Sequence, residues 1–266
     1  MLLNIAHTTR YTYDQPVPYG MQQVRLTPKT RTSQKIIDWS VETDGGEVQL
    51  EFEDQHRNTV LLVVFEPDRT ETVIRCTGQV ETSDSSGVMG EHRGFAPLWY
   101  FKRTTDLTRP GARVKALADA VRGHGEDAIA QLHALSGEIS NQVTYEPGRT
   151  HVRTTAEGVL EQAKGVCQDH VHVFLSAARV IGFPARYVSG YLMMNDRIAQ
   201  DATHAWAEVY VDNVGWIGFD ISNAISPDER YVCAATGLDY LEAAPVSGMR
   251  LGDGNESLYV DLQVQQ

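Results

Sequence analysis

A cysteine, a histidine and an aspartate at three separate points of the chain are residue types that together perform nucleophilic acyl transfer. Cys167 lies in the stretch "GVCQDH", His204 in "THAWAEVYV" and Asp220 in "WIGFDIS". In such a set the thiol attacks a carbonyl carbon, the imidazole moves the proton, and the carboxylate orients the imidazole. The residue types therefore predict a catalytic triad of Cys167, His204 and Asp220.

The position of Cys167 depends on a helix that the sequence predicts directly after it. Apolar residues recur there with helical spacing, at Val171, Phe174, Leu175, Ala178 and Ile181. Gly182 and Pro184 are expected to end this helix. Cys167 would then lie in the first turn, where the helix N-terminus stabilises a thiolate. The alternative is a small buried cysteine that only fills space.

His204 and Asp220 are predicted on neighbouring strands. "THAWAEVYV" alternates, so its small apolar residues are expected to face the core while His204 faces a site or solvent. If "DNVG" forms a tight turn with residue 211 opposite 216, Asp220 falls on the wrong face for His204. We therefore expect a bulge or an irregular strand end between residues 212 and 220. Asp169 and Asp201 are the alternative third members.

Further site residues are less specific. An oxyanion hole would use the backbone N–H of Cys167, with Tyr145 or Gln162 as candidate side-chain donors. Trp206 and Asp169 are candidates for the wall of the cleft. Cys167, His170 and His172 resemble a metal-ligand cluster, but at about 100° per residue they do not converge on one side of a helix. We therefore expect no metal and no organic cofactor.

Two kinds of local pattern divide the chain. Residues 1–85 contain short segments rich in β-branched and aromatic residues, which predict a β-rich N-terminal region. Residues 86–110 are expected to form a connector, and helical spacing begins after Pro110. The range 111–266 is predicted to hold four helices, then a sheet, then a C-terminal strand. Helices followed by strands indicate an α+β fold.

Composition excludes several classes of function. The 266 residues carry a formal net charge of −12, whereas nucleic-acid and membrane-surface binding need a basic surface. No apolar run approaches the roughly 18 residues of a membrane span, and we read no signal peptide at the N-terminus. The three cysteines have no repeating spacing. We expect a cytoplasmic protein with a peptide or protein substrate and no disulfide framework.

The chain resembles the transglutaminase-like superfamily of papain-fold cysteine enzymes. The resemblance rests on "GVCQDHVHVFLSAARVIGFPARYVSGYL" and "DATHAWAEVYVDNVGWIGFDISN". It extends to "IAHTTRYTYDQPV", "QVRLTP" and the C-terminal segment, as in a bacterial branch of candidate cysteine proteases. The resemblance implies a nucleophile helix packed on an antiparallel sheet, preceded by a small all-β domain. It also implies that Cys167 is the nucleophile, His204 the base and Asp220 the third member.

Two positions depart from the pattern of that family. Ile221-Ser222 follows the acid where Pro-Thr is usual, and "DQHRN" at 54–58 stands where Asp-x-x-Gly-Asn is common. The first departure concerns the loop that leaves the site, and the second is expected to touch only a hairpin turn.

The expected reaction is cleavage of a peptide or isopeptide amide through an acyl-enzyme. The resemblance favours hydrolysis by a protease-like enzyme. An amine in place of water would make the protein a cross-linking transglutaminase, and a peptide-binding module without activity is the third alternative. Calcium is not expected, because no EF-hand-like loop is present.

Overall fold

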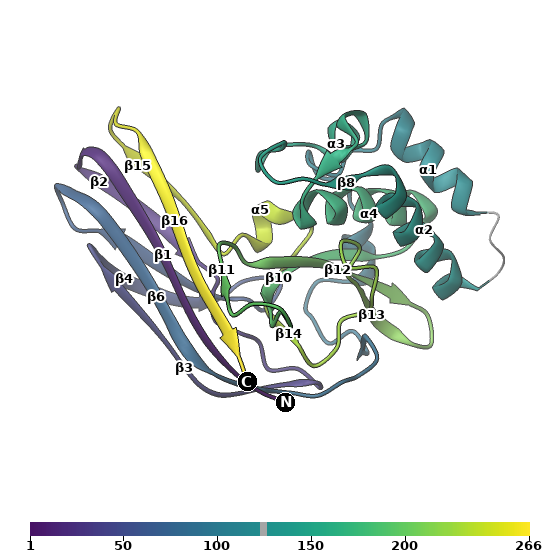
Figure 1. Ribbon diagram of the computed structural model, residues 1–266, viewed down its shortest axis with the longest axis horizontal. Helices are drawn as coiled ribbons and strands as arrows, with labels where there is room; N and C mark the ends of the chain where they lie inside the picture. Colours follow the sequence, from purple (N-terminus) through teal and green to yellow (C-terminus); the bar gives the residue numbers. More distant parts are fainter. Residues whose placement is uncertain (123–126) are drawn as a thin grey trace.

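The computed structural model describes residues 1–122 and 127–266, which form a β-sandwich beside a helix-covered sheet (Figure 1). One sandwich sheet has the order β11 (Ala199–Gln200), β16 (Glu256–Gln265), β1 (Leu2–Val17), β6 (Arg69–Thr82) and β3 (Gln34–Asp44). The other has the order β15 (Val246–Leu251), β2 (Tyr19–Val24), β5 (Thr59–Phe65) and β4 (Gly46–Glu53). Alternate residues of β1, such as Leu3 and Ile5, are buried against Leu61 and Val63 of β5. The predicted β-rich N-terminal region is thus a two-layer sandwich.

The third sheet positions the candidate triad. It is antiparallel throughout. Its order is β14 (Tyr231–Gly237), β10 (Ala185–Leu192), β12 (His204–Val211), β13 (Gly215–Phe219) and β7 (Val88–Gly90). A short parallel pair, β8 (Thr144–Tyr145) and β9 (Lys164–Gly165), lies before the central helix.

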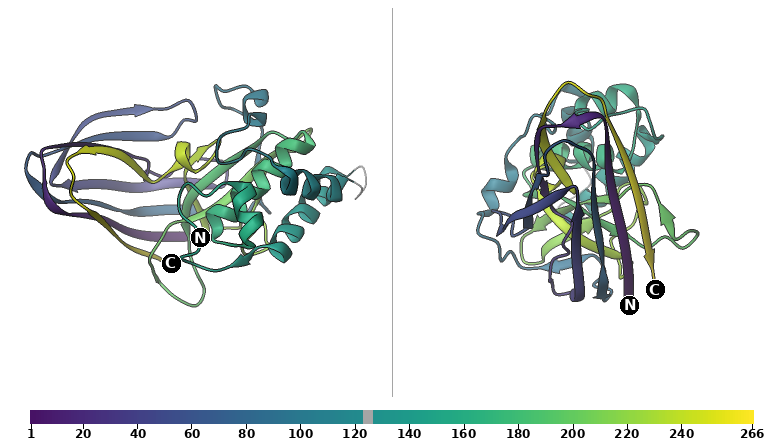
Figure 2. Two further views of the ribbon diagram at one scale, coloured as in Figure 1. Left: turned by 90° about the horizontal axis from the view of Figure 1, so that it is seen from above. Right: turned by 90° about the vertical axis from the view of Figure 1, so that its left-hand side faces the viewer.

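Helices cover one face of this third sheet (Figure 2). They are α1 (Ala112–Arg122), α2 (Ala128–Gln142), α3 (Ala156–Gln162), α4 (Cys167–Ile181) and α5 (Tyr240–Ala243). A 3₁₀ helix at Leu98–Lys102 instead packs through Phe101 against Trp216 of β13. Phe174 and Ala178 of α4 are fully buried with Ala207 and Val209 of β12. The α+β class and the helix packed on an antiparallel sheet are therefore confirmed. Among the described residues, no helix is long and apolar enough to cross a membrane.

The sheets do not follow the order of the sequence. β15 and β16, which the sequence places in the range 111–266, pair with β2 and β1 of the sandwich. β7, within the predicted connector, extends the third sheet beside β13. The two termini consequently lie close together, at the lower edge of the molecule in Figure 1 (see also Figure 2). The domain boundaries stay a prediction, but the last two strands belong structurally with the first.

The hairpin at 54–58 does more than turn the chain. The Asn58 side chain is buried, donates to the carbonyl of Thr236 at 2.8 Å and accepts from its N–H at 2.9 Å. His56 Nε2 lies 2.7 Å from a Glu242 carboxylate oxygen. This hairpin therefore fastens the sandwich to β14 and α5, and the expectation that it touches only a turn is wrong.

Candidate functional site

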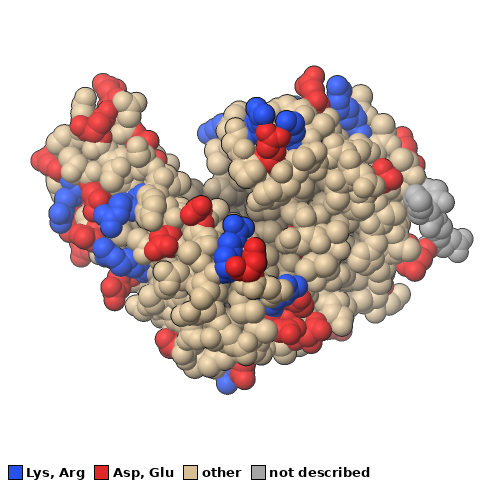
Figure 3. Space-filling model, viewed as in Figure 1, with Lys and Arg blue, Asp and Glu red and all other residues tan. Residues whose placement is uncertain are grey.

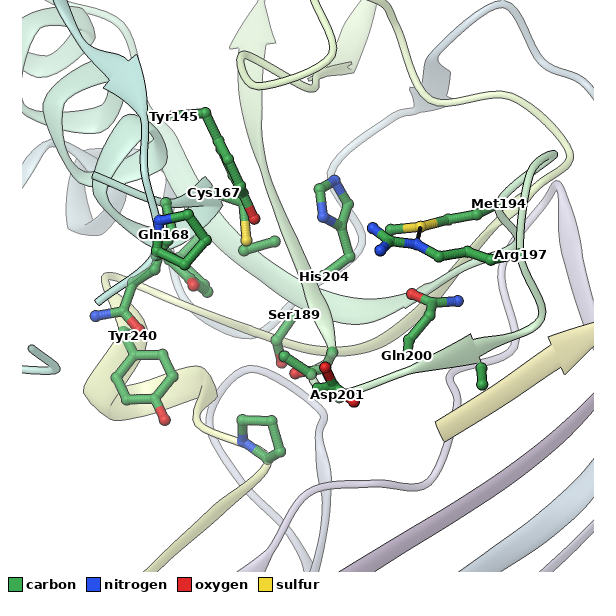
Figure 4. A pocket seen from close by; sticks show the side chains of 18 residues that line it. Tyr145, Cys167, Gln168, Ser189, Met194, Arg197, Gln200, Asp201, His204 and Tyr240 are labelled. Atoms are coloured by element: carbon green, nitrogen blue, oxygen red, sulfur yellow. Dashed lines mark hydrogen bonds between the residues drawn. The ribbon is translucent and has the colours of Figure 1, made fainter. Parts of the chain in front are cut away.

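A cavity of about 470 Å³ lies where the sandwich meets the helical side, at the hollow visible in Figure 3. The first turn of α4, the start of β12 and the loop that carries β11 form its walls. Cys167 and His204 both line it and lie on neighbouring walls in Figure 4. The structure thus brings two of the three predicted triad residues to one open cavity.

The third residue holds the histidine from behind. His204 Nε2 lies 2.6 Å from Asp220 Oδ2, and both residues are buried. The same carboxylate oxygen accepts the Tyr231 hydroxyl and the Asn223 amide, each at 2.7 Å. Burial alone would raise the pKa of Asp220, but these hydrogen bonds and the charge of His204 lower it. Asp220 is therefore an ionised acceptor that fixes the ring of His204.

The turn between β12 and β13 resolves the problem of strand faces. Val211 pairs with Gly215 rather than with residue 216, and Ala207 pairs with Phe219. Continuing this register places Asp220 opposite Trp206 and hence on the face of His204. Asn213 and Gly215 both have positive φ, at 64° and 103°, in this turn. The pairing of β12 with β13 contains no bulge, so of the two expected alternatives the bulge is wrong. β13 does end at Phe219, directly before Asp220. The shorter turn, which pairs residue 211 with 215, is what places Asp220 on the face of His204.

The first turn of α4 is held by its own sequence. Asp169 is buried, accepts the Val166 N–H at 2.8 Å and accepts the Thr150 hydroxyl at 2.6 Å. A side chain at Gly165 would collide with this carboxylate, since an added Cβ would lie 2.6 Å from the Asp169 Cβ. The glycine is thus required by a close approach. These contacts fix Cys167 as the first residue of α4 and leave it partly exposed to the cavity.

The electrostatics of His204 favour its protonated form. Burial lowers the pKa of His204, but hydrogen bonds with Asp220 and Cys167 and the charges of both raise it to about 10. Because Nε2 faces Asp220, Nδ1 is the ring nitrogen left for the thiol. The arrangement can hold an imidazolium beside a thiolate, which is the active form of a Cys-His pair.

The two candidate oxyanion donors have different positions. Tyr145 lines the cavity, and its phenol end points toward the Cys167 sulfur in Figure 4. Burial and the charge of Cys167 raise the pKa of Tyr145, so its hydroxyl stays a donor at neutral pH. Gln162 is exposed at the end of α3 and does not line the cavity. The structure therefore leaves Tyr145 and the Cys167 N–H as donors at the site.

Neither candidate for the cleft wall lines the cavity. Trp206 is buried, with its ring stacked at 25° to the ring of His204, and supports the histidine from the far side. Asp169 caps α4, as described above. His170 is satisfied by Ser222 and the Val143 carbonyl. Ser222 thereby ties the loop after Asp220 to α4, which gives the unusual Ile221-Ser222 pair a local role.

Several residues of the site carry no recognisable signal in the sequence. Tyr231 and Asn223 support Asp220 from β14 and from the loop after β13. The loop of β11 contributes Arg197, Gln200 and Asp201 to the cavity, and it is paired through β11 with β16 of the sandwich. Asp201, an alternative third member, thus lies at the cavity wall. Only the three-dimensional pairing of β11 with the C-terminal strand reveals this wall.

Comparison with known proteins finds family matches for two parts of the chain. Residues 115–221 match the family model of the transglutaminase-like superfamily, and residues 3–81 match that of the bacterial transglutaminase-like N-terminal region. The chain therefore carries a transglutaminase-like core at residues 115–221. The bacterial transglutaminase-like N-terminal region precedes this core and is the first part of the sandwich.

Relatives and solved structures extend the likeness along the chain. An uncharacterized protein of Mycobacterium leprae is 29% identical over 275 residues, which cover 98% of each chain. A protein-glutamine gamma-glutamyltransferase of Pseudomonas aeruginosa is 28% identical over 156 residues, 52% of this chain and 23% of that one. A candidate cysteine protease of Cytophaga hutchinsonii, known as a crystal structure, superposes with a TM-score of 0.78 at 22% identity. That match covers 100% of this chain and 91% of the other, and it shows the shared fold.

Proposed function

We propose that this protein is a cysteine-dependent acyl-transfer enzyme that acts on a peptide or isopeptide amide, with water as the usual acceptor. The observation that carries the proposal is the joint placement of Cys167 and His204 at one open cavity, with Asp220 2.6 Å behind the histidine. A buried cysteine that only fills space would need neither the cavity nor the supported imidazole. The roles of nucleophile, acid–base and orienting group follow from these positions.

In the proposed reaction, the Cys167 thiolate attacks the carbonyl carbon of the amide and a carbon–sulfur bond forms. The oxyanion is stabilised by the Cys167 N–H and the Tyr145 hydroxyl. His204 then gives the proton on Nδ1 to the departing amine as the carbon–nitrogen bond breaks. Water, deprotonated by His204, attacks the acyl-enzyme and releases the acid and the thiolate.

Transfer to an amine is the second candidate, and one observation favours it. The matched protein of Pseudomonas aeruginosa is named a protein-glutamine gamma-glutamyltransferase, a name that describes transfer of a glutamine acyl group. The same acyl-enzyme would serve both reactions, because the acceptor enters only in the second step. The proposals therefore differ in the acceptor and share the triad.

The deciding experiment offers both acceptors at once. A library of glutamine-containing peptides and lysine isopeptides is incubated with the enzyme, with and without a primary amine, and products are read by mass spectrometry. We expect hydrolysis products in water, and an amine adduct only as a minor product. Adducts that dominate at millimolar amine would replace hydrolysis by transfer, and no product from any substrate would contradict both.

Compartment and partners also remain proposals. All three cysteines are unpaired, with Cys76 and Cys233 buried, as expected of a protein in a reducing environment. We propose the cytoplasm and a peptide or protein substrate. Fractionation of cells that produce the full-length protein would test the first of these.

A further inference from the structure

A second cavity, of about 690 Å³, lies away from the triad, between the sandwich and the third sheet. Its walls are the loop that joins β2 to β3, the hairpin at 54–58, the segment after β7, and residues of β10 and β13. This volume lies within the range of small-molecule sites, roughly 300–1,000 Å³. None of the three triad residues lines it.

The loop between β2 and β3 gives this cavity its chemistry. Its residues 27–32 read "TPKTRT", and all six line the cavity. Two cations therefore alternate with hydroxyl groups along one wall, and Thr59 adds a further hydroxyl. Pro28, Ile36, Met89 and Trp216 also line the cavity, so its lining is mixed. Its cationic and hydroxyl donors are the groups that bind oxyanions.

The cavity concentrates positive charge in an acidic protein. Five of the 23 lysines and arginines line it, against two carboxylates, in a chain of net charge −12. The cations are Lys29, Arg31, Arg57, Arg93 and Arg186, and the carboxylates are Glu53 and Glu91. The acidic composition of the chain would predict a negative charge at a surface cavity. The positive charge of this cavity is therefore specific to the contact between the sandwich and the third sheet.

Part of this charge has a structural explanation. The carboxylate of Glu208 is fully buried, with one oxygen 2.7 Å from Arg186 Nε and the other bonded to Arg31. The Arg186 guanidinium also lies 4.0 Å above the centre of the Trp216 ring. The guanidinium groups of Arg31 and Arg186 thus share the single carboxylate of Glu208. The three side chains together keep a net positive charge at the floor of the cavity.

Lys29 adds a charge that no carboxylate pairs. Its ammonium donates to the His56 carbonyl at 2.7 Å and to the Thr236 hydroxyl at 2.9 Å, both neutral acceptors. Among the described residues, neither Lys29 nor Arg93 has a carboxylate oxygen within 4.0 Å. Burial first, and then the charges of Arg31 and Arg186, lower the pKa of Lys29 to about 7, so its amine is only partly protonated at neutral pH. An anion in the cavity would favour the protonated form.

We propose that this cavity is a second binding site, for a small multivalent oxyanion that carries phosphate or carboxylate groups. The side chains of Lys29, Arg31 and Arg186 contact the anion at the floor of the cavity. Those of Arg57 and Arg93 contact it at the rim. The threonine hydroxyls of residues 27–32 supply neutral donors. The site lies where the sandwich meets the third sheet, so an occupant would bind both parts and stabilise their contact.

Calorimetric titration of the full-length protein with inorganic pyrophosphate and with citrate at low salt tests the proposal. Arg57 and Arg93 are exposed and outside the buried network, so the double variant R57Q/R93Q is expected to fold. We expect this variant to bind at least tenfold more weakly than the unmodified protein. Lys29→Met removes the floor charge with similar volume and should weaken binding by a comparable factor. The stronger of the two ligands identifies phosphate or carboxylate as the preferred group.

Two controls locate the site. R10Q/R69Q removes the same charge from two exposed ion pairs on the sandwich, with Glu71 and Glu66, and should change the dissociation constant less than twofold. Cys167→Ala should bind the anion like the unmodified protein, because the triad lies in the other cavity. No measurable binding of either anion would overturn the proposal, as would equal losses in the two double variants. Loss of binding in Cys167→Ala would move the anion to the first cavity and also overturn it.

Discussion

His204 and Glu208 lie on the same face of β12, four residues apart, yet their surroundings differ completely. At about 3.3 Å per residue they are separated by roughly 13 Å. His204, Trp206 and Glu208 are 8%, 2% and 0% exposed, so the face expected to meet a site or solvent is buried along this length. At one end of β12, here called the open end, the His204 imidazole borders an open cavity. At the other, the closed end, the Glu208 carboxylate is enclosed by Arg31 and Arg186.

This difference shows what turns a buried charged residue into a functional one. Both residues have strongly shifted pKa values: that of His204 is raised to about 10 and that of Glu208 is lowered to about 2. Shifted values alone therefore do not identify an active site. Only His204 shares an open cavity with a cysteine, Cys167. The Glu208 end instead joins the loop of Arg31 to the sheet, so we expect mutations there to reduce stability rather than rate.

The largest expected effect is at the open end. Cys167→Ala should reduce turnover to background, because in the proposed reaction the acyl-enzyme forms on this thiol. His204→Ala should reduce the rate by several orders of magnitude. Asp220→Ala should cost less, about 10- to 10⁴-fold, since it orients and stabilises the imidazolium. In the Cys167→Ala background the Asp220 change should add almost nothing. Steady-state rates on an identified substrate, with circular dichroism and thermal melts, provide the measurement.

Two results for Cys167→Ala would contradict the distinction between a functional His204 end and a structural Glu208 end. If Cys167→Ala stayed folded and kept most of its activity, the nucleophile would lie elsewhere. If it lost the fold, the open end would be as structural as the closed one.

Thiol labelling tests the difference between the two ends of β12 through the reactivity of the three cysteines. Cys167 borders the open cavity, whereas Cys233 lies beside the Arg31–Glu208 end and burial raises its pKa. Cys76, within the sandwich, has a pKa raised by burial to about 12. Iodoacetamide at pH 6 should label Cys167 at least 100-fold faster than either, as followed by peptide mass spectrometry. The three rates should converge in 8 M urea, and equal rates in the folded protein would contradict the ion pair.

Much of the open end could be predicted from the sequence, because it depends on local patterns. The helix period after Cys167, the stop at Gly182 and the alternation around His204 each reflect short-range geometry. The error at Asp220 arose because strand faces depend on a single residue of turn length.

The closed end could not be predicted, because its partners come from distant parts of the chain. Glu208 meets Arg31, 177 residues earlier, and Asn58 meets Thr236, 178 residues later. No period or spacing relates such pairs. The return of β15 and β16 to the sandwich is equally non-local. Family resemblance implied an N-terminal β domain, but contact with the third sheet emerges only from packing.

Glu208→Gln tests the stabilising role of the closed end. It leaves Arg31 and Arg186 facing each other without a compensating charge, which should lower the free energy of unfolding by about 3–5 kcal/mol. Activity per folded molecule should stay within about threefold. Urea unfolding and rate measurements check these values, with exposed Glu51→Gln as the matched control. A destabilisation no larger than that of Glu51→Gln would contradict the structural role.

The pH dependence of stability gives a second test of the Glu208 ion pairs. The pKa of Glu208 is about 2 in the folded protein, against an ordinary value of 4.5. Burial raises this pKa, but Arg31 and Arg186 more than offset it. The stabilisation is therefore present above pH 4.5 and is lost as pH falls from 4.5 toward 2. Relative to the unmodified protein, Glu208→Gln should lose less stability over this interval, and parallel curves would contradict this sign.

Tyr231 lies between the two ends, and its removal should give the smallest effect. Its hydroxyl donates to Asp220 at 2.7 Å, and burial raises its own pKa, so it remains a donor. Tyr231→Phe withdraws this stabilisation of the carboxylate, so the pKa of Asp220 should rise and the acid limb of the kcat/KM profile should move to higher pH. The rate at neutral pH should fall about tenfold or less. Tyr191→Phe, which removes a buried hydroxyl between the sandwich and β10, should leave the profile unmoved. If both variants shifted the acid limb equally, the Tyr231 hydroxyl would have no specific effect on Asp220. Asp220 would then be the last residue that supports His204.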